Sequence, residues 1–113
     1  MKIKLTKLSK NYFSAFQSKD LSTLDKLIDK KIKLSDWEVN IKGKKKVLNF
    51  NKKIFKKFKK INIKIVNTAS IFDKKKITFN QILISLDNNS ISVIDVIYFN
   101  KRNKIIKIEA YKM

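Results

Sequence analysis

The sequence predicts a single α+β domain of 113 residues. Two observations predict this class: apolar residues recur at helical spacing in the N-terminal half, and they alternate with polar residues along strands in the C-terminal half. No linker, repeat or low-complexity stretch divides residues 1–113, so one domain accounts for the chain. A chain of this length buries roughly two-thirds of its unfolded surface, which is enough for a hydrophobic core.

Three helices are expected. The first covers about the first 17 residues, and its apolar stripe consists of Leu5, Leu8, Tyr12, Phe13 and Phe16. Asp20 is a typical N-cap for a short second helix, whose apolar residues are Leu21, Leu24, Leu27 and Ile28. Gly43 opens a third helix, with a buried stripe of Val47, Leu48, Asn51, Ile54, Phe55 and Phe58. Lysines from Lys52 to Lys60 form the opposite side of this helix, as a surface helix requires.

Strands account for most of the remainder. Between the second and third helices, Ile32, Leu34 and Asp36 alternate with polar residues and predict a strand with one apolar face. Ile61, Ile63 and Ile65 begin a strand that leads to a turn at residues 73–76. The next strand runs from residue 77 to 86, and its apolar phase slips at residues 80–81, which predicts a β-bulge.

The last two strands follow turns at residues 87–89 and 100–103. The segment 91–99 is apolar on both faces, which predicts a central strand covered on both sides, and residues 104–111 form the final strand. A mostly antiparallel sheet that curves around the helices would enclose a cavity.

Composition excludes several kinds of chemistry. The chain has no cysteine and no histidine, which removes disulfides, thiol nucleophiles, the usual zinc sites and imidazole-based triads. We expect neither a metal nor a cofactor. No apolar leader follows Met1, and no apolar run approaches the ~20 residues that span a bilayer, so a soluble cytoplasmic protein without membrane contact is expected.

The formal net charge of +19 suggests binding to nucleic acid or an anionic surface. However, Arg102 is the only arginine among 28 cationic residues, whereas specific phosphate and base recognition relies on arginine. Lysine, isoleucine and asparagine are all frequent, which indicates a compositional bias. We therefore expect a solvated cationic surface without a specific nucleic-acid partner, and keep a basic surface binder as a third alternative.

Three polar residues interrupt apolar faces. Asp95 lies among the apolar residues of the central strand, where a charged carboxylate is costly unless it is paired or neutralised. An apolar site would raise its pKa and leave a protonated acid that can donate a hydrogen bond. Asp36 ends an apolar strand face, where it is either functional or an ordinary turn-forming aspartate. Tyr12 lies on the stripe of the first helix, and by itself it is also compatible with a core tyrosine.

Together, these residues suggest proton transfer beside a carbonyl group. A carboxylate base would take the proton, while a phenol and a neutral acid hold the developing enolate oxygen. A lysine partner for Asp95, in a purely structural ion pair, is the alternative.

From about residue 11 to 111 the sequence resembles the nuclear transport factor 2-like, SnoaL-like superfamily, and within it the ketosteroid isomerases. The stretch from Tyr12 to Asp36, which includes Lys19-Asp20-Leu21, matches without a gap. Val93-Ile94-Asp95-Val96-Ile97, followed by Ile108-Glu109-Ala110-Tyr111, matches the last two strands of the family. The resemblance implies a cone-shaped fold in which three helices pack in a strongly bent, mostly antiparallel sheet around a pocket.

The resemblance also implies roles for these residues. It places Asp36 on the catalytic base, Tyr12 on the oxyanion-hole tyrosine and Asp95 on the protonated oxyanion-hole acid. The expected pocket walls are Trp37, Phe50, Phe55, Phe58 and Phe79. The chain departs from the family at Trp37, at Asn51 and at Lys112, where the family has a proline, a tyrosine and a large aromatic residue, so the machinery is better supported than a steroid substrate.

The first hypothesis is therefore an isomerase-like enzyme that acts on a small apolar carbonyl compound. The second is a non-catalytic, small-molecule-binding member of the same fold. The two-sided apolar strand 91–99 and the family resemblance also predict a homodimer that pairs through the sheet.

Overall fold

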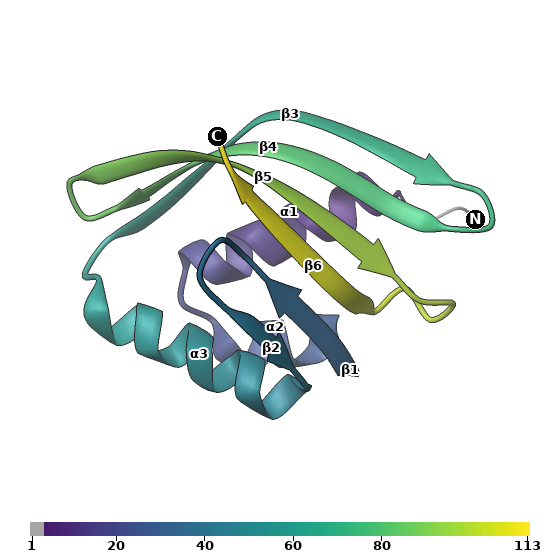
Figure 1. The fold of residues 1–113 in the computed structure, drawn as a ribbon, viewed down its shortest axis with the longest axis horizontal. Helices are drawn as coiled ribbons and strands as arrows, with labels where there is room; N and C mark the ends of the chain where they lie inside the picture. Colours follow the sequence, from purple (N-terminus) through teal and green to yellow (C-terminus); the bar gives the residue numbers. More distant parts are fainter. Residues whose placement is uncertain (1–3) are drawn as a thin grey trace.

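The computed structural model describes residues 4–113, and the first three residues of the expected N-terminal helix lie outside this range. Three helices lie against a six-stranded sheet, as Figure 1 shows. The helices are α1 (Leu5–Gln17), α2 (Leu21–Leu27) and α3 (Lys44–Lys57). The strands are β1 (Ile28–Ser35), β2 (Asn40–Lys42), β3 (Ile61–Phe72), β4 (Lys76–Leu86), β5 (Asn89–Phe99) and β6 (Ile105–Lys112). The α+β class is confirmed.

The sheet has the strand order β2-β1-β6-β5-β4-β3, so β2 and β3 form its open edges. Among the described pairs, β1 and β6 run parallel and the others run antiparallel. In the view of Figure 1 the sheet curls over α1, and α3 lies below both. This arrangement is an open α+β cone. The short strand β2, which the sequence pattern did not predict, pairs with the end of β1 and leads into α3.

Local sequence determines where the helices begin and end. After α1, Lys19 adopts a positive φ of 58°, and the main-chain N–H of Asp20 donates to the carbonyl of Ala15. A left-handed residue followed by such a bond is a common helix C-terminus, and the left-handed position, here Lys19, is most often occupied by glycine. Asp20 then accepts the N–H of Thr23 and is the N-cap of α2, as predicted. Ile28, which was expected at the end of α2, is the first residue of β1.

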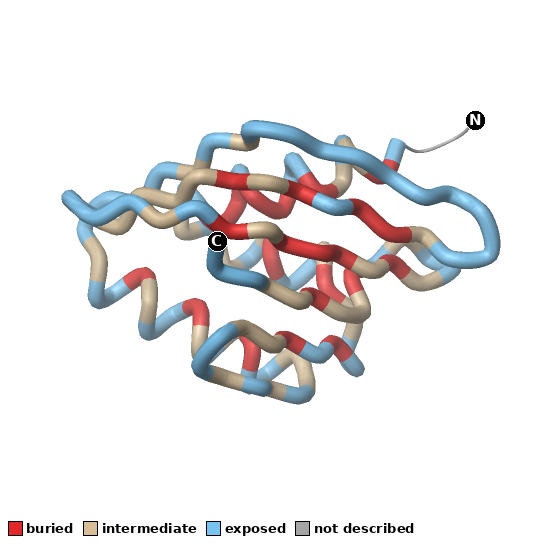
Figure 2. The backbone as a smooth tube through the Cα atoms, turned by 45° about the horizontal axis from the view of Figure 1, so that its top comes forward, coloured by how far each residue is buried: buried red, intermediate tan, exposed pale blue. Residues whose placement is uncertain are grey.

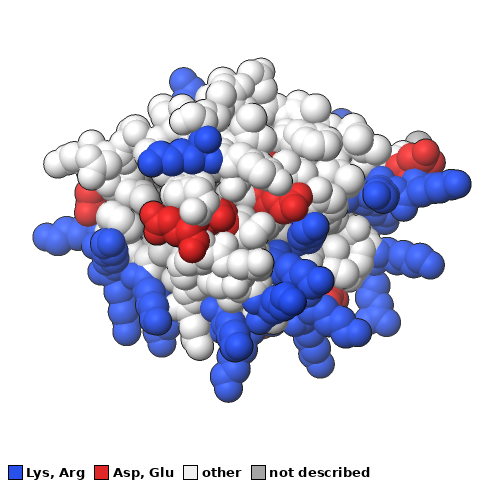
Figure 3. All heavy atoms as spheres, in the orientation of Figure 1, with Lys and Arg blue, Asp and Glu red and all other residues white. Residues whose placement is uncertain are grey.

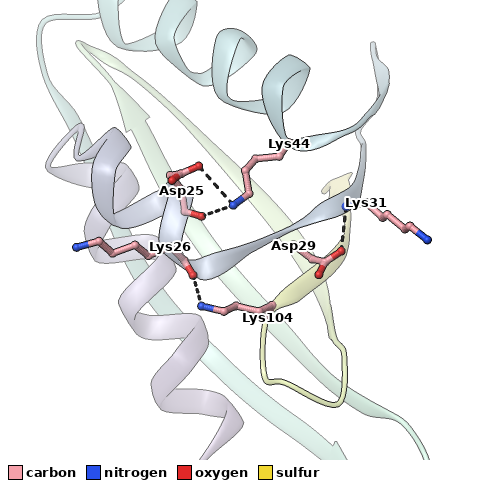
Figure 4. A network of polar contacts seen from close by, with 6 residues as sticks. All are labelled: Asp25, Lys26, Asp29, Lys31, Lys44 and Lys104. Carbon is pink, nitrogen blue, oxygen red and sulfur yellow. Dashed lines mark hydrogen bonds and ion pairs between the residues drawn. The ribbon is translucent and has the colours of Figure 1, made fainter.

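Lysine side chains cap two helix C-termini. Lys44 donates to the carbonyl of Asp25 and forms an ion pair with its carboxylate, while Lys104 donates to the carbonyl of Lys26, as Figure 4 shows. Both carbonyls belong to the last turn of α2, where positive charge is favourable. Lys19 makes the same kind of contact with the carbonyls of Phe58 and Lys59 after α3. Part of the lysine excess therefore stabilises helix ends.

The core lies between the helices and the inner face of the sheet. Figure 2 shows buried residues concentrated in α1 and the middle of β4 and β5, while the edge strand β3 is largely exposed. Ile97 and Ile108 pair across β5 and β6 and are fully buried. Phe16 of α1 meets Phe55 of α3 edge to face, with ring centroids 5.0 Å apart. The central position predicted for β5 in the sheet is confirmed, while cover on its outer face stays a prediction.

The β-bulge predicted at residues 80–81 is wrong. Strand β4 pairs with β5 in unbroken register, and the irregularity lies in β3, where Val66 is the extra residue. The apparent slip has a different cause: Thr78 and Asn80 face the helices and bury their polar groups there. The hydroxyl of Thr78 shares a hydrogen bond of 2.6 Å with that of Ser9 on α1, and the Asn80 amide donates to Thr78. Apolar residues of β4 before this point therefore face outward.

Among the described residues, no helix is long and apolar enough to cross a membrane.

Candidate functional site

A cavity of about 160 Å³ lies between α1, α3 and the inner face of the sheet. Most of its wall is apolar, and the polar side chains in the wall come from four elements or their ends. The lining residues are Tyr12, Phe13, Phe16, Leu34, Asp36, Trp37, Phe50, Asn51, Ile54, Ile63, Ile82, Ile84, Leu86, Ile91, Val93, Asp95, Ile108 and Ala110. The cavity therefore brings together the three residues that the sequence singled out for chemistry.

Asp95 reaches this wall from the middle of β5. Its neighbours on the inner face, Val93 and Ile97, are buried, and Asp95 itself is 9% exposed. Within residues 4–113, no hydrogen bond and no ion pair reaches its carboxyl group, so the structural ion pair with a lysine is not formed. Burial raises the pKa of Asp95 from 3.8 to about 7, and the charge of Asp36 adds to the rise. The neutral acid is therefore well populated near neutral pH.

The backbone around Asp95 is held by its neighbour on β4. Asn80 stands directly opposite Asp95 in the antiparallel pair, and its side-chain amide donates to the Asp95 carbonyl at 3.1 Å. Asn80 in turn accepts a hydrogen bond from Thr68. This contact fixes the main chain of Asp95 and leaves its carboxyl group directed to the cavity.

Tyr12 lies on the inner face of α1, where its ring meets Phe13 edge to face at 5.4 Å between centroids. Only 7% of Tyr12 is exposed, and in the described chain its hydroxyl has no hydrogen-bond partner. Burial raises the pKa of the Tyr12 phenol strongly, and the negative charge of Asp95 raises it further. Tyr12 thus remains a neutral hydrogen-bond donor at any physiological pH.

Asp36 follows the last residue of β1 and is half-buried at the cavity edge. One of its carboxylate oxygens accepts the N–H groups of Glu38 and Val39 at 2.7 and 2.8 Å. Asp36 therefore forms the turn that the sequence left as one alternative, and it also lies in the cavity wall, while its functional role stays a prediction. Its second oxygen has no hydrogen-bond partner among the described residues.

The expected pocket walls divide into two groups. Trp37 and Phe50 line the cavity, and Trp37 is 43% exposed, which places it at the mouth. Phe55 and Phe58 do not line it: Phe55 packs on Phe16 in the core, and Phe58 follows the end of α3. Phe79 was expected in the pocket, but it lies on the outer face of β4 and is 39% exposed. The physical reason is the strand phase, since Thr78 and Asn80 take the inward positions.

Asn51 is the wall residue that the sequence reasoning named but did not place in the site. It lies one turn after Val47 and one turn before Phe55 on the buried stripe of α3, and it is only 3% exposed. Within residues 4–113 its side-chain amide makes no hydrogen bond, and it lines the cavity. A polar residue on an apolar helical stripe was the available signal, of the same kind that identified Asp95.

The described residues bring no group of three or more histidine, cysteine, aspartate or glutamate side chains together in a way that could hold a metal ion. The chemical equipment of the cavity thus consists of one half-buried carboxylate, one acid with a raised pKa, one phenol and one amide. Such a set can accept a proton at one point and donate hydrogen bonds at another.

Charge is unevenly distributed on the surface. In the view of Figure 3, lysine and arginine side chains gather over the lower, helical side, while the upper part over β3 and β4 is largely uncharged. The lysines of α3 from Lys52 to Lys57 are exposed, as the helical pattern predicted, whereas Lys59 and Lys60 were expected on this helix but follow its end.

At the sequence level, no family model and no curated protein matches the chain significantly. Solved structures do match it. An NTF2-like protein of unknown function from Cytophaga hutchinsonii superposes with a TM-score of 0.81 over 100% of this chain and 93% of its own, at 12% identity. A protein from Kribbella flavida that is provisionally named a ketosteroid isomerase gives a TM-score of 0.81 over 96% of this chain and 77% of its own, at 9% identity.

An LEH-like epoxide hydrolase from M. tuberculosis gives a TM-score of 0.75 over 96% of this chain and 82% of its own, at 12% identity. At such identities the similarity establishes the fold, and the activity has to be argued from the site.

Proposed function

We propose that this chain, which has the nuclear transport factor 2-like fold, is a proton-transfer enzyme that moves a double bond beside a carbonyl group through an enolate. Its structural neighbours include proteins named for an isomerase and for an epoxide hydrolase, so the fold supports catalysis in a pocket of this kind. The observation that carries the proposal is the convergence of Tyr12, Asp36 and Asp95 on one apolar cavity.

The reaction divides between a base and two donors. Asp36 takes a proton from the carbon beside the substrate carbonyl, and the electron pair of that C–H bond moves into the enolate. Tyr12 and the neutral Asp95 donate hydrogen bonds to the enolate oxygen, whose charge would otherwise be costly in an apolar site. Asp36 then returns the proton to the γ-carbon, so the double bond moves into conjugation and no atom is gained or lost.

The geometry of Asp36 supports the role of base. The turn N–H groups hold one carboxylate oxygen at 2.7 and 2.8 Å, and the other oxygen is available to a substrate. A carboxylate that is fixed in this way loses little freedom when it abstracts a proton.

The test is an isomerisation assay on a β,γ-unsaturated cyclic ketone, followed by absorbance of the conjugated product. Asp36→Asn should lower kcat by about 10²–10⁴-fold, because an amide cannot accept the proton. The amide oxygen of this variant can still accept the turn N–H groups, so its thermal unfolding should match the wild type.

Asp73→Asn is the matched control, since Asp73 lies in the β3–β4 turn away from the cavity and should leave the rate unchanged. A panel of such ketones that neither wild type nor Asp36→Asn converts would refute catalysis.

A non-catalytic binding protein is the second candidate, and the turn favours it, because two N–H groups already engage Asp36. Mass spectrometry of the natively purified protein would distinguish the two. A retained apolar ligand whose carbon-bound protons do not exchange with deuterated solvent would favour simple binding.

We also propose a homodimer that forms through the outer face of the sheet. This outer apolar face consists of side chains of β3 to β6 that point away from the helices: Ala69, Ile71, Ile77, Phe79, Ile94, Val96, Tyr98 and Tyr111. Ile71, Phe79 and Tyr111 are 39 to 54% exposed. Lys107 and Glu109 also lie on this face, where they pair with each other. Exposed apolar residues of this kind are suited to pairing with a second copy.

A further inference from the structure

The cavity contains one polar group that the proposed reaction does not use. Asn51 is 3% exposed and lines the same wall as Tyr12 and Asp95, yet its amide has no hydrogen-bond partner within residues 4–113. No side-chain nitrogen or oxygen of the described residues is both fully buried and unbonded, so the Asn51 amide is open to the cavity and accessible to a ligand there. The amide is able both to donate and to accept a hydrogen bond.

The size of the cavity limits the size of the ligand that it can hold. Its volume is about 160 Å³. A protein cavity of about 150 Å³ holds a benzene molecule, whereas pockets for drug-sized ligands reach about 300–1,000 Å³. A four-ring steroid would have to leave most of its rings in water beyond Trp37.

Bulky side chains limit the cavity away from Asp95. Ile84 and Ile91 stand opposite each other on β4 and β5, and both line the wall. They lie on the inner face of the same strands that carry Asn80 and Asp95, toward the β4–β5 turn. These two isoleucine side chains therefore occupy space that a longer ligand would need.

From these observations we infer that the ligand is a single six-membered ring with two oxygen functions, one held by Tyr12 and Asp95 and the other by Asn51. This inference rests on the proposed function for the first oxygen, and it adds the ring size and the second oxygen. The substrate class is thus a monocyclic unsaturated ketone that carries a further hydroxyl or carbonyl group.

Phenols provide a test that does not depend on turnover, because a phenol has the shape and the oxygen of a ring enolate. Calorimetry should give at least tenfold tighter binding for the best of catechol, resorcinol and hydroquinone than for phenol. A site built to bond a second oxygen discriminates strongly against a ligand that lacks it. 2-Naphthol should bind at least tenfold more weakly than phenol.

Asn51→Leu should abolish the preference for the dihydric phenol and leave phenol binding within about twofold. The melting temperature of this variant should match that of the wild type, because the Asn51 amide bonds no described residue and is open to the cavity. A purely structural role for Asn51 predicts a lower melting temperature. Asn49→Leu, on an exposed position of the same helix, is the control and should retain the preference.

Ile84→Ala should admit 2-naphthol by enlarging the cavity, and Ile91→Ala is the second variant in case the first does not fold.

Each outcome separates the two proposals. Binding of phenol without a dihydric preference would overturn the role of Asn51 and leave the proposed function standing. Binding of 2-naphthol as tight as that of phenol would overturn the ring size alone. A dihydric preference that Asn51→Leu removes, in a protein that isomerises no ketone, would support this inference and refute catalysis. Absence of binding by every phenol would overturn this inference, while the ketone assay decides the proposed function separately.

Discussion

The negative charge of Asp36 raises the pKa of Asp95, in addition to the larger effect of burial, and together they bring it to about 7. Both carboxyl groups face one cavity. Both effects favour the neutral form of Asp95, which can donate a hydrogen bond. The proposed reaction needs such a donor beside a base, because one group must accept a proton while the other donates a hydrogen bond.

The rate of isomerisation should fall as the pH rises through about 7. Only the neutral form of Asp95 donates to the enolate oxygen, and this form is lost above its pKa of about 7. In Asp95→Asn the amide donates at every pH, so the fall in kcat/KM above pH 7 should disappear. A pH–rate profile of both proteins tests this, and an unchanged fall in Asp95→Asn would assign the titration to another group.

The stability of the protein should also depend on Asp95. Its pKa is raised in the folded state, so the folded protein binds this proton more tightly than the unfolded chain does. The stabilising contribution is complete below about pH 4 and is lost as the pH rises to about 7, with an upper limit of roughly 4 kcal/mol.

Denaturant unfolding of wild type and Asp95→Asn at pH 5 and pH 8 measures this contribution. The variant should gain stability relative to the wild type between the two values. An equal difference at both would show that Asp95 is not the responsible group.

Removal of the Tyr12 hydroxyl should affect catalysis and not stability. Because no described group bonds this hydroxyl, Tyr12→Phe should change the free energy of unfolding by less than about 1 kcal/mol. It should lower kcat by about 10²–10³-fold, as expected for one enolate-stabilising donor.

Tyr98→Phe is the matched control. The Tyr98 hydroxyl donates to Glu109 at 2.6 Å on the outer face, and this bond, together with partial burial and the charge of Glu109, raises the pKa of Tyr98 to about 12. Its loss should leave kcat unchanged. Equal effects of the two substitutions on kcat would contradict the assignment of Tyr12.

A charge on the outer apolar face should separate the proposed dimer. Phe79→Lys places an ammonium group in the middle of this face, where it would be buried by a partner at high cost. Light scattering should give the mass of a dimer for the wild type and of a monomer for the variant. Phe72→Lys is the control. Phe72 is 49% exposed and lies at the β3–β4 tip, but its side chain points to the face of the sheet opposite to the outer apolar face. A monomeric wild type would refute the dimer itself.

The sequence alone determined the three helices and five of the six strands, with approximate limits, but not β2. The helical stripes of α1 and α3, the Asp20 N-cap and Gly43 each rest on interactions within one or two turns of chain, which a local pattern contains. Asp95 was also identified from the sequence, since a carboxylate among inward-facing apolar residues of one strand is a local contradiction.

Only the tertiary structure decided which residues share the cavity. The position of Phe79 depends on whether Thr78 and Asn80 find partners inside, and one of those partners is Ser9, 69 residues earlier in the chain. In the same way, Phe55 is a core residue because Phe16 of another helix meets it. A sequence pattern does not show whether a polar residue finds a hydrogen-bond partner inside the protein. Asn51 finds none among the described residues, and it lines the cavity instead.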